Sequence, residues 1–551
     1  MQRLFYLFLF LVISGIQLPA QNKTATPAST GIARPRLVVG IVIDQMRWDY
    51  LYRYYNRYGS DGFKRLLGQG FSCENTLINY LPSYTAVGHS TVFTGSVPAL
   101  DGIAGNEWIE QLTGKTLYCT DDSTVQSVGV ESPDGKMSPR NLLVSTITDE
   151  LRLATNFKSR VVGVSLKDRA SILPAGHTAT AAFWLDDASG HFITSSYYMS
   201  QLPEWVNQFN NGSPIQHLIE KGWNTLYPIN TYTQSDKDDM PYEGKFAGET
   251  APVFPHAIND VYVKNKGSFR QTPFGNTLTL NFAKAAVDAY KLGRGDATDF
   301  LTINCASTDY VGHMFGPNSI EIEDTYLRLD QQLAAFFQDL DAKVGKGQYL
   351  VFLTADHGAA HTIGFMQQHE LPADFWNGKP LAEALNKLLA DKFNTPGLVR
   401  SLMNYQVNFN MGSIGDNHLD FAAIKKASIE YLQQQPGIAY AVDVSEVGKA
   451  PLPEPLKTMV TNGYNFKRSG AIQIVLNPGW FEGYGKTGTT HGTWNPYDTH
   501  IPLLWYGWNI RPGKTNRVTH MTDISATLAA LLHIQQPNGC IGEPIQEVTG
   551  K

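Results

Sequence analysis

Short apolar runs that stop abruptly at polar residues are the strongest constraint on how this 551-residue chain can fold. Residues 36–43, 160–166, 300–305, 349–354 and 500–506 are dominated by apolar side chains, without regular polar alternation. Runs of this kind are typical of strands covered on both faces, as in a parallel sheet between helices. The first four runs end at Asp44, Lys167–Arg169, Ser307–Asp309 and Asp356–Gly358.

Segments with helical spacing of apolar residues lie between these runs. Residues 276–291 repeat apolar side chains at helical intervals, and residues 318–342 open with acidic residues before an apolar face. The alternation predicts an α/β fold with a doubly wound, mostly parallel sheet and helices on both faces. Ligands bind such sheets beyond the carboxyl ends of the strands, where the polar residues that end the runs are expected to meet.

Two long interruptions predict further parts around this sheet. Residues of about 170–274 are rich in aromatic residues, Gly and Asn, and we expect them to form a cap beside the site. Residues 369–470 contain a helical segment (419–434) and a strand-like segment (438–443), which predicts an inserted α+β subdomain. The catalytic core would then comprise residues 35–368 and 471–551.

The N-terminus has the layout of a secretory signal. A positive start at Arg3 precedes an apolar run over 4–13 that is too short to span a bilayer, and small residues follow it. We therefore predict a cleaved signal peptide over 1–20, a tether over 21–34 and a periplasmic or secreted protein without a stable membrane anchor; a retained anchor is the alternative. Export permits disulfides, and Cys73, Cys119, Cys305 and Cys540 allow three pairings.

The charge of the chain argues against nucleic acid as a partner. The formal net charge is -6, and Lys and Arg are scattered without a basic block. Binding to a phosphate backbone needs a basic surface. We expect a monomer that acts on small molecules.

Carboxylate and imidazole side chains recur at the ends of the predicted strands. Asp309 and His313 are spaced to share one face of a helical turn, Asp356 and His357 follow another run, and Asp44 ends the first. The last candidate, His491, precedes the final run. Two sets of three such ligands, each with an open position, are what a catalytic two-metal site requires. Each residue alone is weak evidence, because a strand-end Asp is often a helix cap or turn former.

Thr85 is the candidate nucleophile. Pro82 and Ser83 resemble a helix start, which would place Thr85 in the first turn, where free N–H groups and the helix dipole favour a phosphate. A threonine hydroxyl needs a metal or a base to become nucleophilic. Spacing alone also permits Ser83 or Ser90, or a purely capping role for Thr85.

Taken together, these residues resemble the alkaline phosphatase superfamily, and within it the phosphate-irrepressible (PafA-type) periplasmic monoesterases. The resemblance runs in order over nearly the whole mature chain. The matching segments are Ile43–Arg47, Tyr84–His89, Gly105–Trp108, Lys167–Arg169, Asp309 with His313, Ala355–Gly358 and His491–Gly492.

This resemblance implies a role for each candidate residue. One zinc would be held by Asp309, His313 and His491, and a second by Asp44, Asp356 and His357. Thr85 would be a further ligand of the second zinc and the nucleophile that forms a covalent phosphothreonine. Lys167, Arg169 and Asn106 would contact the nonbridging oxygens of the phosphoryl group.

The implied activity is that of an alkaline phosphatase, a phosphate-monoester hydrolase with two Zn²⁺ ions that releases inorganic phosphate. Two cations aimed at the extra charged oxygen of a monoester, from Lys167 and Arg169, would favour monoesters over diesters. Two alternatives stay open at this point. One is a phosphodiesterase or nucleotide pyrophosphatase on the same metal core, and the other is a catalytically silent, zinc-stabilised binding protein.

Overall fold

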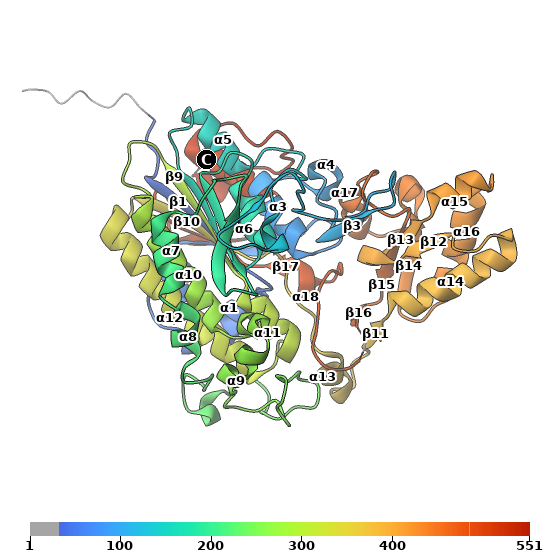
Figure 1. Ribbon diagram of the computed structural model, residues 1–551, viewed down its shortest axis with the longest axis horizontal. Coiled ribbons are helices and arrows are strands. Elements are labelled where there is room, and N and C mark those ends of the chain that lie inside the picture. Colours follow the sequence, from blue (N-terminus) through green and yellow to red (C-terminus); the bar gives the residue numbers. More distant parts are fainter. Residues whose placement is uncertain (1–31, 484, 551) are drawn as a thin grey trace, which may run out of the picture. The chain divides into compact units, whose positions relative to one another are not determined.

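A computed structural model describes residues 32–483 and 485–550 of the chain (Figure 1). The predicted signal peptide and most of the predicted tether lie outside these residues and stay predictions. The unit Arg34–Lys551 is built around an eleven-stranded sheet. Its strands, in spatial order, are β17 (His500–Ile501), β2 (Phe71–Leu77), β18 (Leu503–Gly507), β10 (Tyr349–Thr354), β1 (Leu37–Ile43), β9 (Asp299–Cys305), β6 (Val161–Val164), β7 (Ala181–Asp186), β8 (His191–Ser195) and β5 (Ser127–Val128), with β19 (Gly513–His520) paired to β2.

The middle of this sheet is parallel and fully buried. Strands β10, β1, β9, β6 and β7 all run in the same direction. Every residue of these five strands is buried, because helices cover both faces, which explains the uninterrupted apolar runs. The predicted doubly wound, mostly parallel α/β fold is confirmed.

Helices form two groups on opposite faces of the sheet (Figure 1). One group contains α3 (Thr85–Thr94), α5 (Ile147–Ala154), α6 (Asp168–Ala175) and α19 (Asp523–Leu532), which pack on one another. The other contains α10 (Phe274–Ala289), α11 (Ser307–Phe315) and α12 (Ile320–Leu340). Helix α12 begins where the hydroxyl of Ser319 accepts a hydrogen bond from the Ile322 amide at 3.2 Å, as an N-cap does.

The segment predicted as a cap contributes to the sheet as well. Residues 181–195 form β7 and β8, which extend the main sheet, and the rest of the segment carries α7 (Glu204–Asn211), α8 (Pro214–Ile219) and α9 (Ile258–Lys264). The strand β7 was not expected there, because its six buried residues form a run too short to stand out from the surrounding sequence, which is rich in aromatic residues and Gly. A cap over the whole of 170–274 stays a prediction.

The inserted segment has a sheet of its own, at the right of Figure 1. Strands β12 (Val399–Ser401), β13 (Gln406–Phe409), β15 (Ile472–Leu476) and β14 (Ile438–Asp443) pair in this order. Helices α14 (Gly378–Phe393) and α16 (Phe421–Leu432) pack against them around a separate apolar core. Strand β15 pairs with β13 and β14, and β16 (Trp480–Glu482) pairs with β11 (Asp374–Trp376). A boundary drawn by sheet membership therefore extends past residue 470. The predicted domain limits remain predictions.

The four cysteines are all free in the part of the chain that the structure describes, and three of them are buried. The disulfides that export would permit are therefore not formed here. Within residues 32–483 and 485–550, each helix is too short or too polar to cross a bilayer.

Candidate metal centre and active site

The polar residues that end the strands meet at one edge of the main sheet. Asp44 follows β1, Asp356 and His357 follow β10, and Asp309 lies in the first turn of α11 after β9. His491 reaches the same edge from the other direction, because β18 runs antiparallel to β10 and its first residue, Leu503, lies opposite Thr354 at the end of β10. The loop that precedes β17 and β18 therefore lies at the carboxyl edge of the parallel strands.

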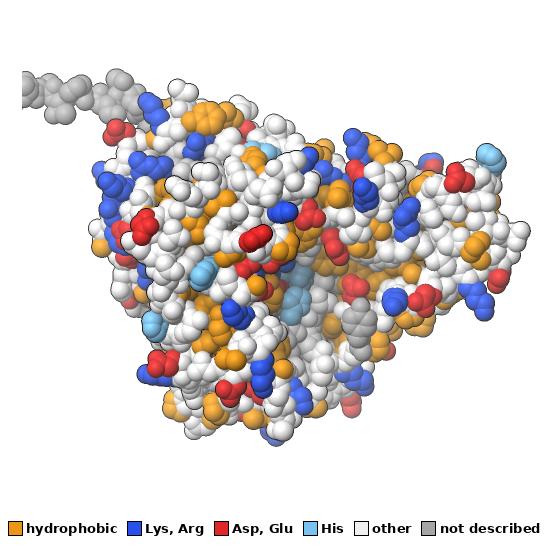
Figure 2. All heavy atoms as spheres, in the orientation of Figure 1, with side chains coloured by type: hydrophobic (Ala, Val, Ile, Leu, Met, Phe, Trp, Pro, Cys, Tyr) orange, Lys and Arg blue, Asp and Glu red, His pale blue; other side chains and the backbone are white. Residues whose placement is uncertain are grey.

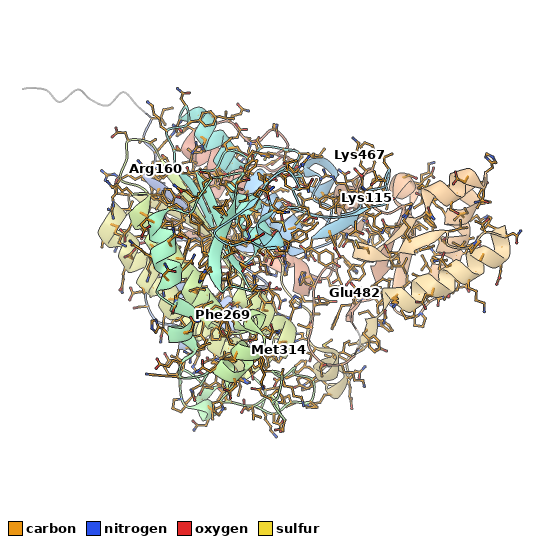
Figure 3. The ribbon with its side chains drawn as sticks, viewed as in Figure 1. Lys115, Arg160, Phe269, Met314, Lys467 and Glu482 are labelled. Carbon is orange, nitrogen blue, oxygen red and sulfur yellow. The ribbon has the colours of Figure 1, made fainter. Side chains whose placement is uncertain are left out.

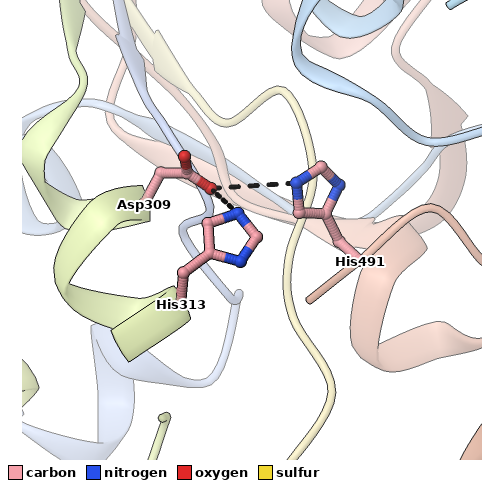
Figure 4. A group of neighbouring side chains, drawn as sticks. All are labelled: Asp309, His313 and His491. Carbon is pink, nitrogen blue, oxygen red and sulfur yellow. Dashed lines mark ion pairs between the residues drawn. The ribbon is translucent and has the colours of Figure 1, made fainter. Parts of the chain in front are cut away.

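These residues form two groups of three ligands. In the first ligand group, Asp309 Oδ1 lies 3.0 Å from His313 Nε2 and 3.8 Å from His491 Nε2 (Figure 4). In the second ligand group, His357 Nε2 lies 3.3 Å from Asp356 Oδ2 and 3.7 Å from Asp44 Oδ1. Within each group one ligand atom from every residue lies within 4.8 Å of the others. A space-filling view shows histidine side chains in a hollow of the surface (Figure 2).

The three histidines all present the same nitrogen to their group. Each Nδ1 lies 2.7–3.0 Å from a backbone carbonyl, which only accepts, so Nδ1 carries the proton and Nε2 keeps its lone pair for a cation. The carbonyls belong to Thr489, Gly358 and Ser83, for His313, His357 and His491 respectively. Hydrogen bonds of this kind fix the tautomer and orientation of metal-ligating histidines.

The carboxylates of the second group also fit a cation. The side chains of Asp44 and Asp356 are completely buried, and Asp44 Oδ1 and Asp356 Oδ2 accept no hydrogen bond from the described residues. Unpartnered buried carboxylate oxygens are costly unless a cation binds them. Burial and the neighbouring Asp356 raise the pKa of Asp44 well above its ordinary value. Two sets of Asp and His ligands match the donor chemistry of a two-metal site.

Lys167 lies between the two ligand groups. Its buried ammonium donates to Asp44 Oδ2 at 2.9 Å and to Asp309 Oδ2 at 2.7 Å. Burial alone would lower the pKa of Lys167, but the charges of Asp309 and Asp44 outweigh it and raise the pKa. The ammonium is therefore held as a cation at the centre of the site.

Thr85 faces the second group from the N-terminus of α3. Its Oγ1 lies 3.5 Å from His357 Nε2, and only 2% of the residue is exposed. Asn106 Oδ1 accepts a hydrogen bond from the Ala86 amide, the next N–H of the same turn, at 2.9 Å. The hydroxyl of Thr85 and the side-chain amide of Asn106 therefore both lie at the start of α3.

Arg169 and Asn106 lie beside the ligand groups without contacting them. Arg169 lies two residues after Lys167, in the first turn of α6. Its guanidinium donates a hydrogen bond to the Tyr118 hydroxyl at 2.9 Å. Within the described residues, no hydrogen bond or ion pair links either side chain to the six ligands. Seven predicted metal-site residues, Thr85 included, and Lys167 are thus brought together, with Arg169 and Asn106 at their margin.

Gln45 is a site residue that the sequence did not reveal. Its backbone adopts φ 63°, its N–H donates to Asp356 Oδ1 at 3.2 Å, and its side-chain Nε2 donates to Asp309 Oδ1 at 2.7 Å. One residue thus connects the two ligand groups. A Cβ added to Gly312 would lie 2.0 Å from Gln45 Oε1, so the glycine makes room for this contact. Only the position of Gln45 next to Asp44 could have signalled the role.

His89 and a stacked pair of histidines make further contacts around the two ligand groups. His89 Nδ1 lies 2.9 Å from the Thr85 carbonyl and 3.3 Å from Asp356 Oδ2, so it joins the first turn of α3 to the second ligand group. The rings of His357 and His491 stack with their centroids 3.4 Å apart and their planes at 12°. The two ligand groups therefore contact each other through these two stacked rings.

Comparison with known proteins places this architecture in a family. Residues 38–500 match the family model of type I phosphodiesterase / nucleotide pyrophosphatase. Alkaline phosphatase PafA of Elizabethkingia meningoseptica is 53% identical over 543 residues, which cover 98% of each chain. Alkaline phosphatase PhoV of Synechococcus elongatus is 52% identical over 523 residues, 94% of this chain and 93% of that protein.

A solved structure agrees with these sequence matches. The crystal structure of wild-type alkaline phosphatase PafA superposes with a TM-score of 0.93 at 54% identity, covering 94% of this chain and 100% of that one. The predicted family is thereby confirmed. The chain belongs to the PafA-type alkaline phosphatases, within the type I phosphodiesterase / nucleotide pyrophosphatase family.

Proposed function

We propose that this alkaline phosphatase hydrolyses phosphate monoesters through a covalent phosphothreonine on Thr85, at a centre of two zinc ions. The observation that carries the proposal is the meeting of two three-ligand groups, with the Thr85 hydroxyl 3.5 Å from the ligand nitrogen of His357. The names of the relatives, alkaline phosphatases at 52–53% identity, support the reaction class.

The two ligand groups would each hold one zinc ion. Asp309, His313 and His491 would bind the first, and the second ligand group together with Thr85 would bind the other. Mixed carboxylate and imidazole donors favour zinc over the hard cations, which take oxygen ligands alone. Bound zinc would supply the Lewis acidity that stabilises charge on the attacking and leaving oxygens.

The chemistry on Thr85 would proceed in two steps. In the first, the Thr85 oxygen bonds to phosphorus while the bond to the alcohol oxygen breaks; the hydroxyl proton passes to solvent and the alcohol takes one up. In the second, a water oxygen bonds to phosphorus while the bond between phosphorus and the Thr85 oxygen breaks; the water gives up a proton, the Thr85 oxygen takes one up, and inorganic phosphate leaves. The Ala86 N–H at the start of α3 is taken by Asn106 Oδ1, and the remaining N–H groups of this turn favour the phosphate charge in both steps.

Three further side chains would hold the phosphoryl oxygens. Lys167 is a buried cation at the centre of the site, and Arg169 follows two residues later in the first turn of α6. The Asn106 carbonyl is fixed by the Ala86 amide, which leaves its NH₂ group to donate. Two cations aimed at an additional charged oxygen would favour monoester dianions over diesters.

Replacing the nucleophile tests the covalent step. We expect Thr85→Ala to lower kcat for a phosphate monoester by about a thousandfold or more, because no oxygen can accept the phosphoryl group. The variant should keep its zinc, measured by elemental analysis, because six protein ligands remain; Thr85→Ser is the matched control and should retain turnover. Substantial activity in Thr85→Ala would remove Thr85 from this role, and zinc without turnover in the unaltered protein would favour a binding protein.

Replacing Arg169 tests the substrate class. We expect Arg169→Ala to reduce kcat/KM for a monoester about tenfold more than for a diester with the same leaving group, because the diester lacks the oxygen that the guanidinium would bind. Equal losses on both substrates would contradict this assignment. A faster reaction on the diester in the unaltered protein would favour the phosphodiesterase alternative.

We also infer that the chain is exported to the periplasm or secreted and acts as a monomer. The signal-like pattern of residues 1–20 supports export. N-terminal sequencing of the mature protein would locate the cut, and sedimentation would give the oligomeric state. A cytoplasmic protein that retains Met1 would contradict the export.

A further inference from the structure

A cavity of about 500 Å³ opens beside the nucleophile. One wall is formed by Tyr84, which precedes Thr85, and by Asn106, which holds the next amide of α3. The cavity is also lined by Glu107, by residues 378, 379, 382 and 400–404 of the inserted segment, and by Glu482. Figure 3 shows Glu482 between the main sheet and the smaller sheet. The volume is typical of small-molecule sites, and one end of the cavity begins at the residues that flank the helix start.

Four charged side chains line this cavity without neutralising one another. Lys379 and Arg400 are the cations, and Glu107 and Glu482 are the anions. Among the described residues, none of the four forms an ion pair. Arg400 Nη2 donates to Asn410 Oδ1 at 3.1 Å, which fixes the guanidinium without neutralising it. Both signs of charge are therefore available to a molecule in the cavity.

An aromatic pair supports the carboxylate side of the cavity. The Tyr84 ring stacks on Tyr405 with centroids 6.5 Å apart and planes at 18°. The Glu482 amide donates to the Tyr405 hydroxyl at 3.1 Å, which fixes the backbone of Glu482 next to this pair. An aromatic face beside a carboxylate attracts an organic cation.

We propose that this cavity receives the alcohol part of the substrate, and that it favours monoesters whose alcohol carries both a carboxylate and an ammonium group, as phosphorylated amino acids do. Arg400 and Lys379 would attract the carboxylate, and Glu482 and Glu107 the ammonium group. The inference rests on the proposed function, because it needs the phosphoryl group to be held at Thr85. Glu482 and Arg400 act as specificity residues in it.

Four aryl phosphates with the same phenolic leaving group separate the two charges. O-Phospho-L-tyrosine carries both, desaminotyrosine phosphate only the carboxylate, tyramine phosphate only the ammonium group and p-cresyl phosphate neither. We expect each charge to raise kcat/KM about two- to fivefold relative to p-cresyl phosphate, as exposed ion pairs do. The increments should shrink with added salt, which screens exposed charges.

Variants assign each increment to its residue. Arg400→Gln should bring the ratio of desaminotyrosine phosphate to p-cresyl phosphate towards one, and Glu482→Gln should do the same for tyramine phosphate. Lys449→Gln and Glu446→Gln are matched controls, because this exposed pair, 3.0 Å apart, belongs to the same segment and lies outside the cavity. Both ratios should stay unchanged in the controls.

The outcomes distinguish this inference from the proposed function. Equal kcat/KM on all four esters, or ratios that Arg400→Gln and Glu482→Gln leave unchanged, would overturn the leaving-group inference alone. Failure to turn over any of the four esters with zinc bound would overturn the proposed function and this inference with it.

Discussion

Gln45 is a single residue that donates hydrogen bonds to both ligand groups. Its N–H and its side-chain amide donate to Asp356 and Asp309, from a backbone with φ 63° that non-glycine residues rarely adopt. Such strain persists only where surrounding contacts compensate for it, and it is frequent at functional sites. The two donated hydrogen bonds are the compensation here.

Removing the side-chain amide of Gln45 should weaken metal binding. We expect Gln45→Ala to lower the zinc affinity of the first ligand group about 10- to 100-fold, because Asp309 loses the donor that orients it. Competition with a chromophoric chelator measures the affinity. Gln45→Gly should weaken binding as much while relieving the left-handed backbone, and an unchanged affinity in both variants would contradict the positioning role.

Gly312 provides an independent control for this contact. Gly312→Ala should displace the Gln45 side chain and weaken zinc binding, since the new Cβ would lie 2.0 Å from Oε1. In the Gln45→Ala background the same change should have little further effect, because nothing remains to be displaced.

The clustering of the candidate metal ligands could be predicted from the sequence, whereas the position of Gln45 could not. Asp44, Asp309, Asp356 and His357 follow or terminate buried runs, and the edge rule for parallel strands brings such positions together. Gln45 acquires its role from a left-handed backbone, which depends on contacts with residues more than 260 positions away. Local sequence carries no signal for such a contact.

Helix α3 is the element that positions Thr85, the proposed nucleophile. All ten of its residues are buried, so the helix is fixed on every side. Gly88 allows its close approach to the end of β10, because an added Cβ would lie 2.5 Å from the Asp356 carbonyl oxygen and 2.6 Å from its Cβ. The position of Thr85 therefore depends on the absence of a side chain one turn away.

A methyl group at this contact should separate the helix from the metal ligands. We expect Gly88→Ala to lower the free energy of unfolding by about 1–3 kcal/mol, as overpacking does, and to lower kcat through the displacement of Thr85. Urea unfolding and monoester kinetics measure the two effects. Gly68→Ala is the matched control, since Gly68 is an exposed residue of α2 (Phe63–Gln69) with no atom within 4 Å of a new Cβ, and it should be neutral or stabilising by up to about 1 kcal/mol.

Strands buried on both faces and helices with one buried face were the predictable elements. The runs at β1, β9 and β10 and the helical spacing at α10 and α12 appear where expected, because burial dictates their composition directly. The direction of β18 was not predictable, since an apolar run reads the same in a parallel and an antiparallel strand. That direction nevertheless decides where His491 lies.

At the scale of the whole molecule, the ligand groups concentrate buried negative charge at the sheet edge. Asp44, Asp309 and Asp356 are all buried within one site, with Lys167 as a compensating cation. Bound metal ions would neutralise them in the folded state only. Metal binding is therefore expected to be linked to stability.

Removing the metal should destabilise the fold. At a zinc concentration about 100 times the dissociation constant of each site, we expect the free energy of unfolding to exceed that of chelator-treated protein by about 5 kcal/mol, since each of the two proposed sites contributes about 2.7 kcal/mol. Denaturant midpoints with chelator and after zinc is restored measure the difference. In an Asp309→Asn, Asp356→Asn variant the two midpoints should nearly coincide, and coincidence in the unaltered protein would contradict the linkage.

The antiparallel direction of β18 has a consequence for the order in which the ligand groups are completed during synthesis of the chain. The ligands span the chain from Asp44 to His491, so a growing polypeptide lacks one corner of the first ligand group until almost nine-tenths of it has been made. A nascent or truncated chain cannot close that group around an ion. Loading of the first ligand group would then be among the last events of maturation, whereas the second group is complete once His357 has been made.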